Sequence, residues 1–354
     1  MNILFVTDLI PIKESENCAK ALVPIVKELS LNANVDIVRP NFLLNSLIRG
    51  KKILKNGQYS CCGLEIKNIN FYLPFLTEIK TIDVDKYDKI IAHMPSGILF
   101  VERLLKFCEK RPIVVYAVHQ SDIHLMTSLK YAIYFRNAMK KAYKNCDKIL
   151  CRAPHLKQKL LKILPDALVK TEVKSSKIEK SFFVSEEEMF AKIKAHECIK
   201  FLTAANLIKR KNVDIAIKAF AQFKGYDFTF EIIGEGKELY KLKRVVKKLK
   251  MDDKISFLGR LSNEETLKKM REANVFILPS INETLGLAYL EASASGCLCI
   301  GTKNTGIDGL FQDNINCFLT EPSVNSLVKV LNKVFKLTEE DFKNLLSNRK
   351  IVEF

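Results

Sequence analysis

One stretch of the chain combines a buried strand, a loop with an acidic residue and a helix with a second acidic residue. The apolar run Val275–Leu278 predicts the strand, and Leu287–Ser295 predicts the helix, with Gly296 as its C-cap. Glu283 therefore lies in the loop, and Glu291 lies about two turns into the helix. A strand that leads through a short loop into a helix is typical of an α/β unit with a parallel sheet.

The start of this helix is suited to bind a phosphate group. Leu285, Gly286 and Leu287 lie where free backbone N–H groups and the helix dipole favour an anion. Glu283 and Glu291 flank this point, so the unit is expected to hold a diphosphate and to accept hydrogen bonds from hydroxyl groups on both sides of it. A nucleotide-sugar has this layout of groups.

The rest of the chain predicts two domains of ordinary size within its 354 residues. Residues 2–7, 19–29 and 35–38 predict a strand, a helix and a strand, which is a Rossmann-like beginning. Residues 199–205 predict the first strand of the second unit. We therefore predict an N-terminal acceptor-binding domain over residues 1–185 and a C-terminal donor-binding domain over residues 186–354.

The string from Pro279 to Ala292, P-S-x-x-E-x-x-G-x-x-x-x-E-A, resembles the E-x7-E element of retaining glycosyltransferases of family 4. The resemblance covers most of the chain. It implies the GT-B fold, in which two Rossmann-like, doubly wound domains face each other across a cleft. It also implies transfer of a sugar from a nucleotide-sugar, expected to be a UDP-sugar, to a hydroxyl acceptor with retention and without a metal.

The resemblance assigns roles to the charged residues of the second domain. Glu283 would bind the hydroxyls of the donor sugar, and Glu291 would bind the ribose. The family loop G-R-L-x-x-x-K-G places Lys211 at the lysine that binds the donor diphosphate. Asn206 replaces the arginine of that loop, and Lys209 or Arg210 is available to compensate. The remaining donor-binding residues implied by the resemblance are Gly234, Leu258, Leu285, Gly286 and Leu287.

A histidine at the end of a predicted strand completes the catalytic set. Residues 113–119 predict a strand that ends at His119, and residues 89–93 predict one that ends at His93. Ligands of doubly wound sheets bind at the carboxyl ends of strands. The resemblance favours His119, because the family has a histidine near the donor sugar there. The predicted catalytic residues are His119, Glu283 and Lys211. The family's Gly-Gly pair in the first loop is absent from residues 11–17.

The net charge of +17 implies anionic partners. Residues 140–180 contain twelve Lys/Arg against four Asp/Glu, and residues 237–250 contain seven against one. Such basic, amphipathic stretches suit the anionic inner face of a cytoplasmic membrane, although a general lysine bias of the source genome explains them almost as well. Zinc-finger, RRM and KH signatures for nucleic-acid binding are absent.

Composition points to a cytoplasmic protein without a cofactor. The chain has no run of 18 apolar residues, and residues 1–8 predict a first strand instead of a signal peptide. The ten cysteines include no C-x-x-C pair, so neither a zinc site nor a redox pair is expected. No D-x-D motif occurs in a loop suited to hold a metal-bound diphosphate. Cys297 and Cys299 lie in an apolar run and are expected to be core residues.

Other functions remain open beside the transferase. Asn206 and the missing Gly-Gly pair also fit a non-catalytic protein that binds polyanions or membranes on a degenerate GT-B scaffold. A nucleotide-sugar epimerase of the same fold is a further alternative. The favoured interpretation is a bacterial-type enzyme of polysaccharide or lipopolysaccharide biosynthesis, with a lipid-linked or surface-glycan acceptor.

Overall fold

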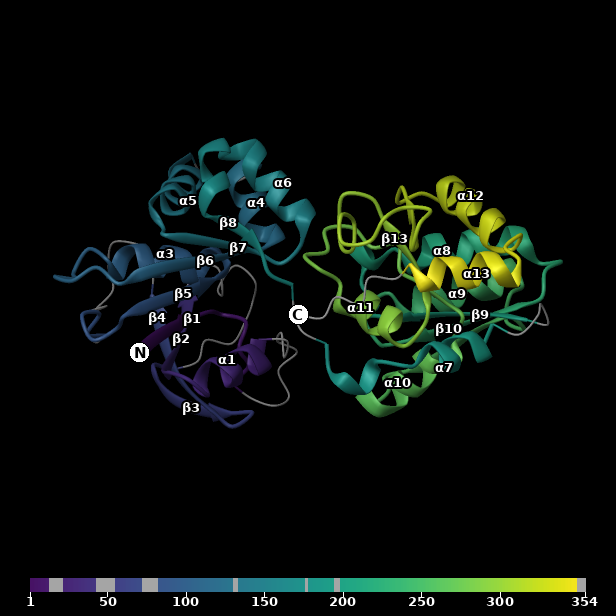
Figure 1. Ribbon diagram of the computed structural model, residues 1–354, viewed down its shortest axis with the longest axis horizontal. Coiled ribbons are helices and arrows are strands. Elements are labelled where there is room, and N and C mark those ends of the chain that lie inside the picture. The colour runs from purple at the N-terminus through teal and green to yellow at the C-terminus, as the bar shows by residue number, and fades with distance from the viewer. Residues whose placement is uncertain are drawn as a thin grey trace. The chain divides into compact units, whose positions relative to one another are not determined.

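The computed structural model describes residues 1–12, 22–42, 55–71, 82–129, 133–175, 178–193 and 198–348. The chain divides into two compact units (Figure 1). The first unit comprises Met1–Arg152 and Leu156–Lys174, and the second comprises Ala153–His155 and Ser175–Phe354. The division expected from the sequence was between residues 185 and 186. Residues 153–155 thus belong to the second unit, although they precede Leu156–Lys174, the last segment of the first unit.

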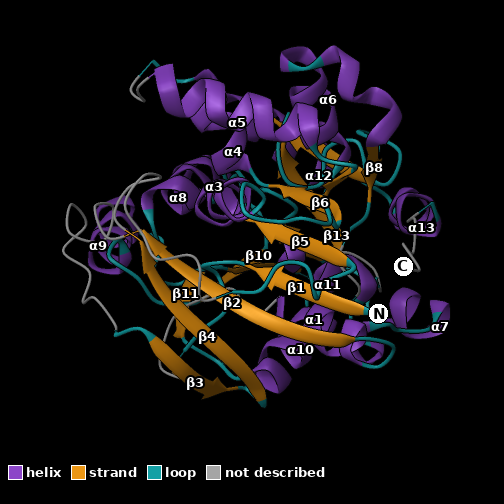
Figure 2. Cartoon of the chain, turned by 90° about the vertical axis from the view of Figure 1, so that its left-hand side faces the viewer, coloured by secondary structure: helices purple, strands orange, loops and turns teal. Residues whose placement is uncertain are grey.

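The first unit is built on one eight-stranded sheet with the order β3-β4-β2-β1-β5-β6-β7-β8 (Figure 2). All neighbouring strands are parallel except β3, which pairs with β4 in the antiparallel direction. The chain order reverses between β1 and β5. The strands are β1 (Asn2–Val6), β2 (Asn34–Phe42), β3 (Gly57–Cys61), β4 (Leu64–Phe71), β5 (Lys89–His93), β6 (Ile113–Val118), β7 (Lys148–Cys151) and β8 (Thr171–Val173).

Helices cover both faces of this sheet because its central strands are apolar on both sides. In β1, Leu4 and Val6 belong to one buried cluster, and Ile3 and Phe5 belong to another. The first cluster packs under α3, α4, α5 and α6, and the second packs under α1. The helices are α1 (Val23–Ser30), α3 (Met94–Leu104), α4 (Gln120–Thr127), α5 (Ile133–Asn145) and α6 (Pro154–Ile163), with a 3-10 helix η3 (Pro165–Lys170).

The second unit has a six-stranded, fully parallel sheet with the order β11-β10-β9-β12-β13-β14. Numbered from β9, this is the Rossmann order 3-2-1-4-5-6, and the order reverses between β9 and β12. The strands are β9 (Ile199–Ala204), β10 (Phe228–Ile233), β11 (Ile255–Gly259), β12 (Val275–Ile277), β13 (Leu298–Thr302) and β14 (Cys317–Thr320).

The second sheet is also doubly wound. In β12, Val275 and Ile277 pack into the cluster under α8, α9, α12 and α13, while Phe276 packs under α10 and α11. The helices are α7 (Glu186–Ala191), α8 (Val213–Phe220), α9 (Leu239–Leu249), α10 (Asn263–Glu272), α11 (Leu287–Ala294), α12 (Val324–Val334) and α13 (Glu339–Ser347), with 3-10 helices η4 (Lys180–Phe182), η5 (Lys209–Lys211) and η6 (Ala221–Phe223).

These two sheets confirm the prediction of two Rossmann-like, doubly wound domains. The described cysteines are free thiols, and Cys297 and Cys299 are buried in the core as expected. Most of the first loop, residues 13–17, lies outside the described residues. Among the described helices, none combines the length and the apolar character needed to cross a membrane.

Candidate active site

The loops that follow β9 and β12 meet at the point where the strand order of the second sheet reverses. The N–H of Ile281 donates to the carbonyl of Arg210 at 2.9 Å, and the side-chain amide of Asn212 donates to the carbonyl of Pro279 at 3.0 Å. Ligands of open α/β sheets bind at such a switch point. The loop of residues 206–212 and the loop of residues 278–286 therefore form the candidate site.

Two cations converge on one carboxylate oxygen in this site. Arg210 Nη1 and Lys211 Nζ lie 2.5 and 2.6 Å from Oε1 of Glu283. The side chains of Lys211 and Glu283 are only 12% and 10% exposed, whereas that of Arg210 is 44% exposed. Two cations against one carboxylate leave a net positive charge at the switch point. Such a site favours an anionic ligand, because a charged group near phosphate oxygens forms strong hydrogen bonds.

The pKa values of the buried pair reflect competition between burial and ion pairing. Burial alone would raise the pKa of Glu283, but the charges and hydrogen bonds of Lys211 and Arg210 hold it below its usual value. Burial lowers the pKa of Lys211, and Glu283 opposes this shift. The ion pair thus keeps Glu283 ionised and counteracts deprotonation of Lys211.

The backbone of Glu283 is fixed by two side chains that were not among the predicted site residues. The N–H of Glu283 donates to Oγ1 of Thr305 at 2.6 Å, and this hydroxyl lies 3.0 Å from the Glu283 carbonyl. Nε2 of His155 lies 3.1 Å from the same carbonyl. His155 is 128 residues away in sequence, so no local pattern could reveal this contact. Thr305 lies in the turn after β13.

The turn after β10 brings a third loop to the site. The backbone of Gly234 has φ +128°, and a Cβ atom there would lie 1.9 Å from the carbonyl oxygen of Ala205. The N–H of Gly234 also donates to the carbonyl of Gly259 at 2.7 Å, which ties the end of β10 to that of β11, and the close approach to Ala205 adds the end of β9. Any larger residue would force these loops apart. Leu258 is half-buried in β11, and Asn206 is exposed beside this turn.

Helix α11 begins at Leu287, as the sequence predicted. Gly286 is its N-cap with φ +74°, so Leu287 is the first helical residue. Glu291 consequently lies about one turn into the helix, and the prediction of two turns was wrong. The left-handed backbone of Gly286 cannot continue a right-handed helix, which fixes the start of α11 at Leu287. Leu285 is buried, and burial raises the pKa of the half-buried Glu291, with Glu179 adding to the shift.

The first unit contains a histidine pair at the carboxyl edge of its sheet. His93 ends β5 and His119 follows β6, and Nδ1 of His93 lies 3.1 Å from Nε2 of His119. The N–H of His119 donates to the carboxylate of Asp122 at 2.6 Å. The two histidines were competing candidates in the sequence, but the structure joins them. One ring must donate and the other accept, so each histidine constrains the tautomer of the other.

Desolvation makes both histidines hard to protonate. It lowers the pKa of His119 to about 3, with help from the charge of Arg152, and it lowers that of His93 well below the usual value. In contrast, burial raises the pKa of Asp122 to about 8. The histidine pair is therefore neutral near neutral pH and suited to hydrogen bonding.

These shifts predict a pH dependence of stability. A histidine whose folded pKa is depressed loses its stabilising contribution as the pH falls below its usual value of 6.5. At about pH 5 the cost is about 2 kcal/mol for one such histidine. We expect the wild type to lose more unfolding free energy than His119→Gln between about pH 7 and pH 5, measured by urea unfolding. Asp122, whose pKa is raised in the folded state, changes the stability in the opposite direction over this pH range, but it is present in both proteins. Equal losses in the two proteins would contradict the assignment.

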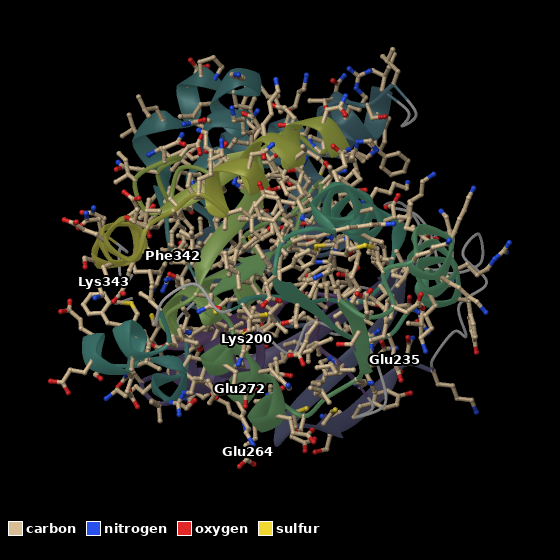
Figure 3. The ribbon with its side chains drawn as sticks, turned by 90° about the vertical axis from the view of Figure 1, so that its right-hand side faces the viewer. Lys200, Glu235, Glu264, Glu272, Phe342 and Lys343 are labelled. Carbon is tan, nitrogen blue, oxygen red and sulfur yellow. The ribbon has the colours of Figure 1, made fainter. Side chains whose placement is uncertain are left out.

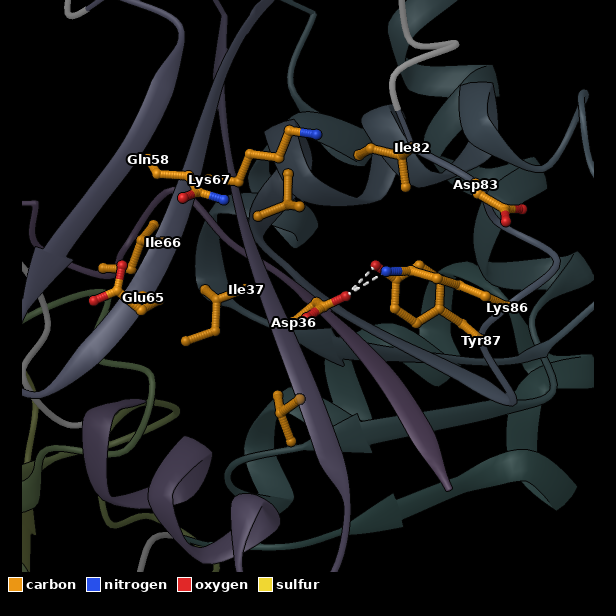
Figure 4. A pocket seen from close by; sticks show the side chains of 12 residues that line it. Asp36, Ile37, Gln58, Glu65, Ile66, Lys67, Ile82, Asp83, Lys86 and Tyr87 are labelled. Carbon is orange, nitrogen blue, oxygen red and sulfur yellow. Dashed lines mark hydrogen bonds and ion pairs between the residues drawn. The ribbon is translucent and has the colours of Figure 1, made fainter.

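Two other hollows lie away from these carboxyl edges. In the first unit, a pocket of about 420 Å³ is lined by the early residues of β2 and β4, and Asp36 accepts hydrogen bonds there from Lys86 and Tyr87 (Figure 4). In the second unit, a smaller hollow at the start of β9 is lined by several residues, including Lys200 and Glu272, which Figure 3 labels. Lys269 in this hollow pairs with Glu231 and Glu272. No group of three or more metal-ligating side chains occurs within the described ranges.

A Rossmann-order sheet with cations at its switch point is the architecture of a nucleotide-binding unit. Comparison with known proteins supports the assignment to this class. Residues 184–349 match the family model of glycosyl transferases group 1. An uncharacterized glycosyltransferase of Methanocaldococcus jannaschii is 29% identical over 273 residues, which are 76% of this chain and 71% of that protein. The human phosphatidylinositol N-acetylglucosaminyltransferase subunit is 28% identical over 145 residues, which are 40% of this chain and only 30% of that protein.

The fold of the whole chain also resembles solved structures. The crystal structure of Anabaena HepE in complex with UDP and glucose superposes with a TM-score of 0.69 at 16% identity, over 98% of this chain and 93% of that one. Over residues 184–349 the chain thus matches the group 1 glycosyltransferases, in line with the predicted family 4 type, and as a whole it has the GT-B fold. The predicted family and fold are thereby confirmed.

Proposed function

We propose that the chain transfers a sugar from a nucleotide-sugar, expected to be a UDP-sugar, to an acceptor hydroxyl with retention of configuration. The observation that carries this proposal is the convergence of Lys211 and Arg210 on Glu283 at the switch point. These groups offer two cationic donors for a diphosphate and one carboxylate for sugar hydroxyls within one site. In keeping with the family resemblance, we assign the first role to Lys211 and Arg210 and the second to Glu283.

The proposed reaction breaks the bond between the anomeric carbon and the phosphate oxygen of the donor. The acceptor hydroxyl forms its new bond on the same face, and its proton passes to the departing phosphate. Negative charge grows on the diphosphate during this step. Lys211, Arg210 and the start of α11 would stabilise that charge, so the proposed mechanism uses side-chain cations in place of a metal. Glu291 is assigned to the ribose, and His119 to the donor sugar.

Several residues are assigned to hold the donor by position alone. Gly234, Leu258 and Leu285 to Leu287 lie at the ends of β10 and β11 and at the start of α11. Asn206 carries no charge to replace the family arginine, but Arg210 shares the Glu283 oxygen with Lys211. Lys209 is exposed and forms no ion pair with a described residue. Of the two compensating cations, the geometry favours Arg210.

For the acceptor we propose a lipid-linked or lipopolysaccharide-type intermediate in the synthesis of a bacterial surface glycan. This proposal rests on the basic composition of the chain and on a relative whose name specifies phosphatidylinositol. We accordingly propose a cytoplasmic protein that works at the inner face of the membrane. The partners are then the nucleotide-sugar donor and the glycan or lipid-linked acceptor, without a role for nucleic acid.

A panel of UDP- and GDP-sugars tests the proposed function. We expect one UDP-sugar to bind and to be hydrolysed slowly without an acceptor, with the released sugar first appearing in the anomeric form of the donor. NMR of the fresh product distinguishes the anomers. Conversion of one nucleotide-sugar into another would favour the epimerase. Binding of polyanions without turnover of any donor would favour the non-catalytic scaffold.

A further inference from the structure

The surface around α5 of the first unit combines exposed apolar side chains with exposed lysines. At the start of α5, Ile133 and Tyr134 are 69% and 50% exposed. Beyond its end, Leu168 and Val169 on η3 are 56% and 98% exposed. Large apolar side chains in such positions cost free energy unless something covers them.

The second apolar pair lies beside the C-terminal end of α5. Lys170 of η3 donates from Nζ to the carbonyls of Lys144 and Cys146, at 2.6 and 2.8 Å. This contact places η3 against the C-terminal end of α5. We call the exposed side chains of Ile133, Tyr134, Lys141, Lys144, Leu168 and Val169 the α5 surface.

Cations lie between the apolar pairs. The sequence of α5 contains four basic residues and no acidic residue. Lys141 and Lys144 are exposed, and neither forms an ion pair with a described residue. One stripe of α5 follows the helical spacing of Ile133, Asn137, Lys141 and Lys144. Met139 and Tyr143 lie on the other side of the helix and face the core. The α5 surface therefore presents a positive centre with an apolar group at each end.

We propose that the α5 surface binds an anionic lipid bilayer. A helix that lies in the plane of a membrane places lysines among acidic headgroups and apolar side chains at the acyl boundary. The α5 surface offers both kinds of group on an element that is already folded. A nucleic acid would be attracted by the lysines, but its phosphate backbone would gain nothing from contact with exposed aliphatic side chains such as Ile133 and Val169. Charge and apolar exposure together therefore select a lipid surface.

Helix α9 of the second unit provides a matched comparison. It contains five basic residues and no acidic residue, yet Tyr240 is the one large apolar residue of that helix that is strongly exposed. If net charge alone drew the protein to membranes, α9 would contribute as much as α5. If binding needs both positive charge and exposed apolar side chains, only the α5 surface will bind vesicles.

The chain has no tryptophan, so single tryptophan reporters can test this proposal directly. We expect the fluorescence of Tyr134→Trp to shift to the blue with vesicles of phosphatidylcholine and phosphatidylglycerol, and not with phosphatidylcholine alone. Tyr240→Trp on α9 is the control and is expected to show no shift. A blue shift at Tyr240 and none at Tyr134 would overturn the proposal.

Sedimentation with the same vesicles measures the affinity of the full chain. We expect the double variant Lys141→Glu/Lys144→Glu to bind anionic vesicles at least about tenfold more weakly, since each lysine near an anionic surface contributes several-fold. Ile133→Ser/Val169→Ser should weaken binding without changing the charge. Lys247→Glu/Lys248→Glu on α9 has the same charge change and should keep most of the affinity. Thermal unfolding checks that each variant is folded.

Three results would overturn the proposal. They are equal binding to neutral and anionic vesicles, equal losses in the α5 and α9 charge variants, and binding of duplex DNA while vesicles are ignored. None of these measurements uses sugar transfer. Failure of membrane binding is therefore distinguishable from failure of the proposed enzymatic function.

Discussion

Alanine in place of Lys211 is expected to lower kcat/KM for the nucleotide-sugar by about 100-fold or more. The loss of one preorganised donor to a developing negative charge typically has an effect of this size. Lys211 is almost buried and lies at the switch point, so water cannot easily replace its ammonium group. Steady-state kinetics with the preferred donor measure the change, and the larger part should appear in kcat.

Lys209→Ala is the matched control for this experiment. Lys209 belongs to the same 3-10 turn, but its side chain is exposed, and it has no ion pair within the described part of the chain. Its replacement should change kcat/KM by no more than about twofold, as is typical of exposed charges. Comparable losses in the two variants would contradict a specific role for Lys211. Arg210→Ala should fall between them, because Arg210 shares the Glu283 oxygen but is more exposed.

The sequence predicted the strands of the second sheet well because each is a short apolar run followed by a polar loop. The run Val275–Leu278 became β12, and the loop after β9 carries Lys211 as expected. Both loops could be placed at one ligand because the Rossmann connection brings those strand ends together. The predicted convergence of Lys211 and Glu283 on one region is seen as an ion pair.

Other features of the site depended on backbone geometry or on distant contacts. The sequence left Lys209 and Arg210 as equal candidates for the second cation of the site. The 3-10 turn η5 ends at Asn212, which has a φ of +52°, and in this turn Arg210 is the residue that reaches Glu283. The start of α11 at Leu287 was predicted, but the depth of Glu291 in that helix was overestimated as two turns. His155 belongs to the same unit as Glu283 but is separated from it in sequence by a segment of the first unit, so no spacing could predict their contact.

Glutamine in place of Glu283 is expected to lower kcat/KM by about 100-fold, and to make nucleotide binding sensitive to high pH. The activity falls because a neutral amide loses the charge-assisted hydrogen bonds proposed for the donor-sugar hydroxyls. Burial already lowers the pKa of Lys211, and Glu283 is the group that opposes this shift. Without the carboxylate, Lys211 will lose its proton at a lower pH than in the wild type.

UDP binding measured by calorimetry from about pH 7 to pH 9.5 tests the second part of this prediction. The variant should lose affinity at a lower pH than the wild type, because deprotonated Lys211 no longer attracts the diphosphate. Glu264→Gln, on the exposed first turn of α10 (Figure 3), removes one negative charge outside the site and should leave both activity and pH profile unchanged. If Glu283→Gln and the wild type bind UDP with the same pH profile, Glu283 does not control the charge of Lys211, and the assigned coupling between sugar and diphosphate recognition is wrong.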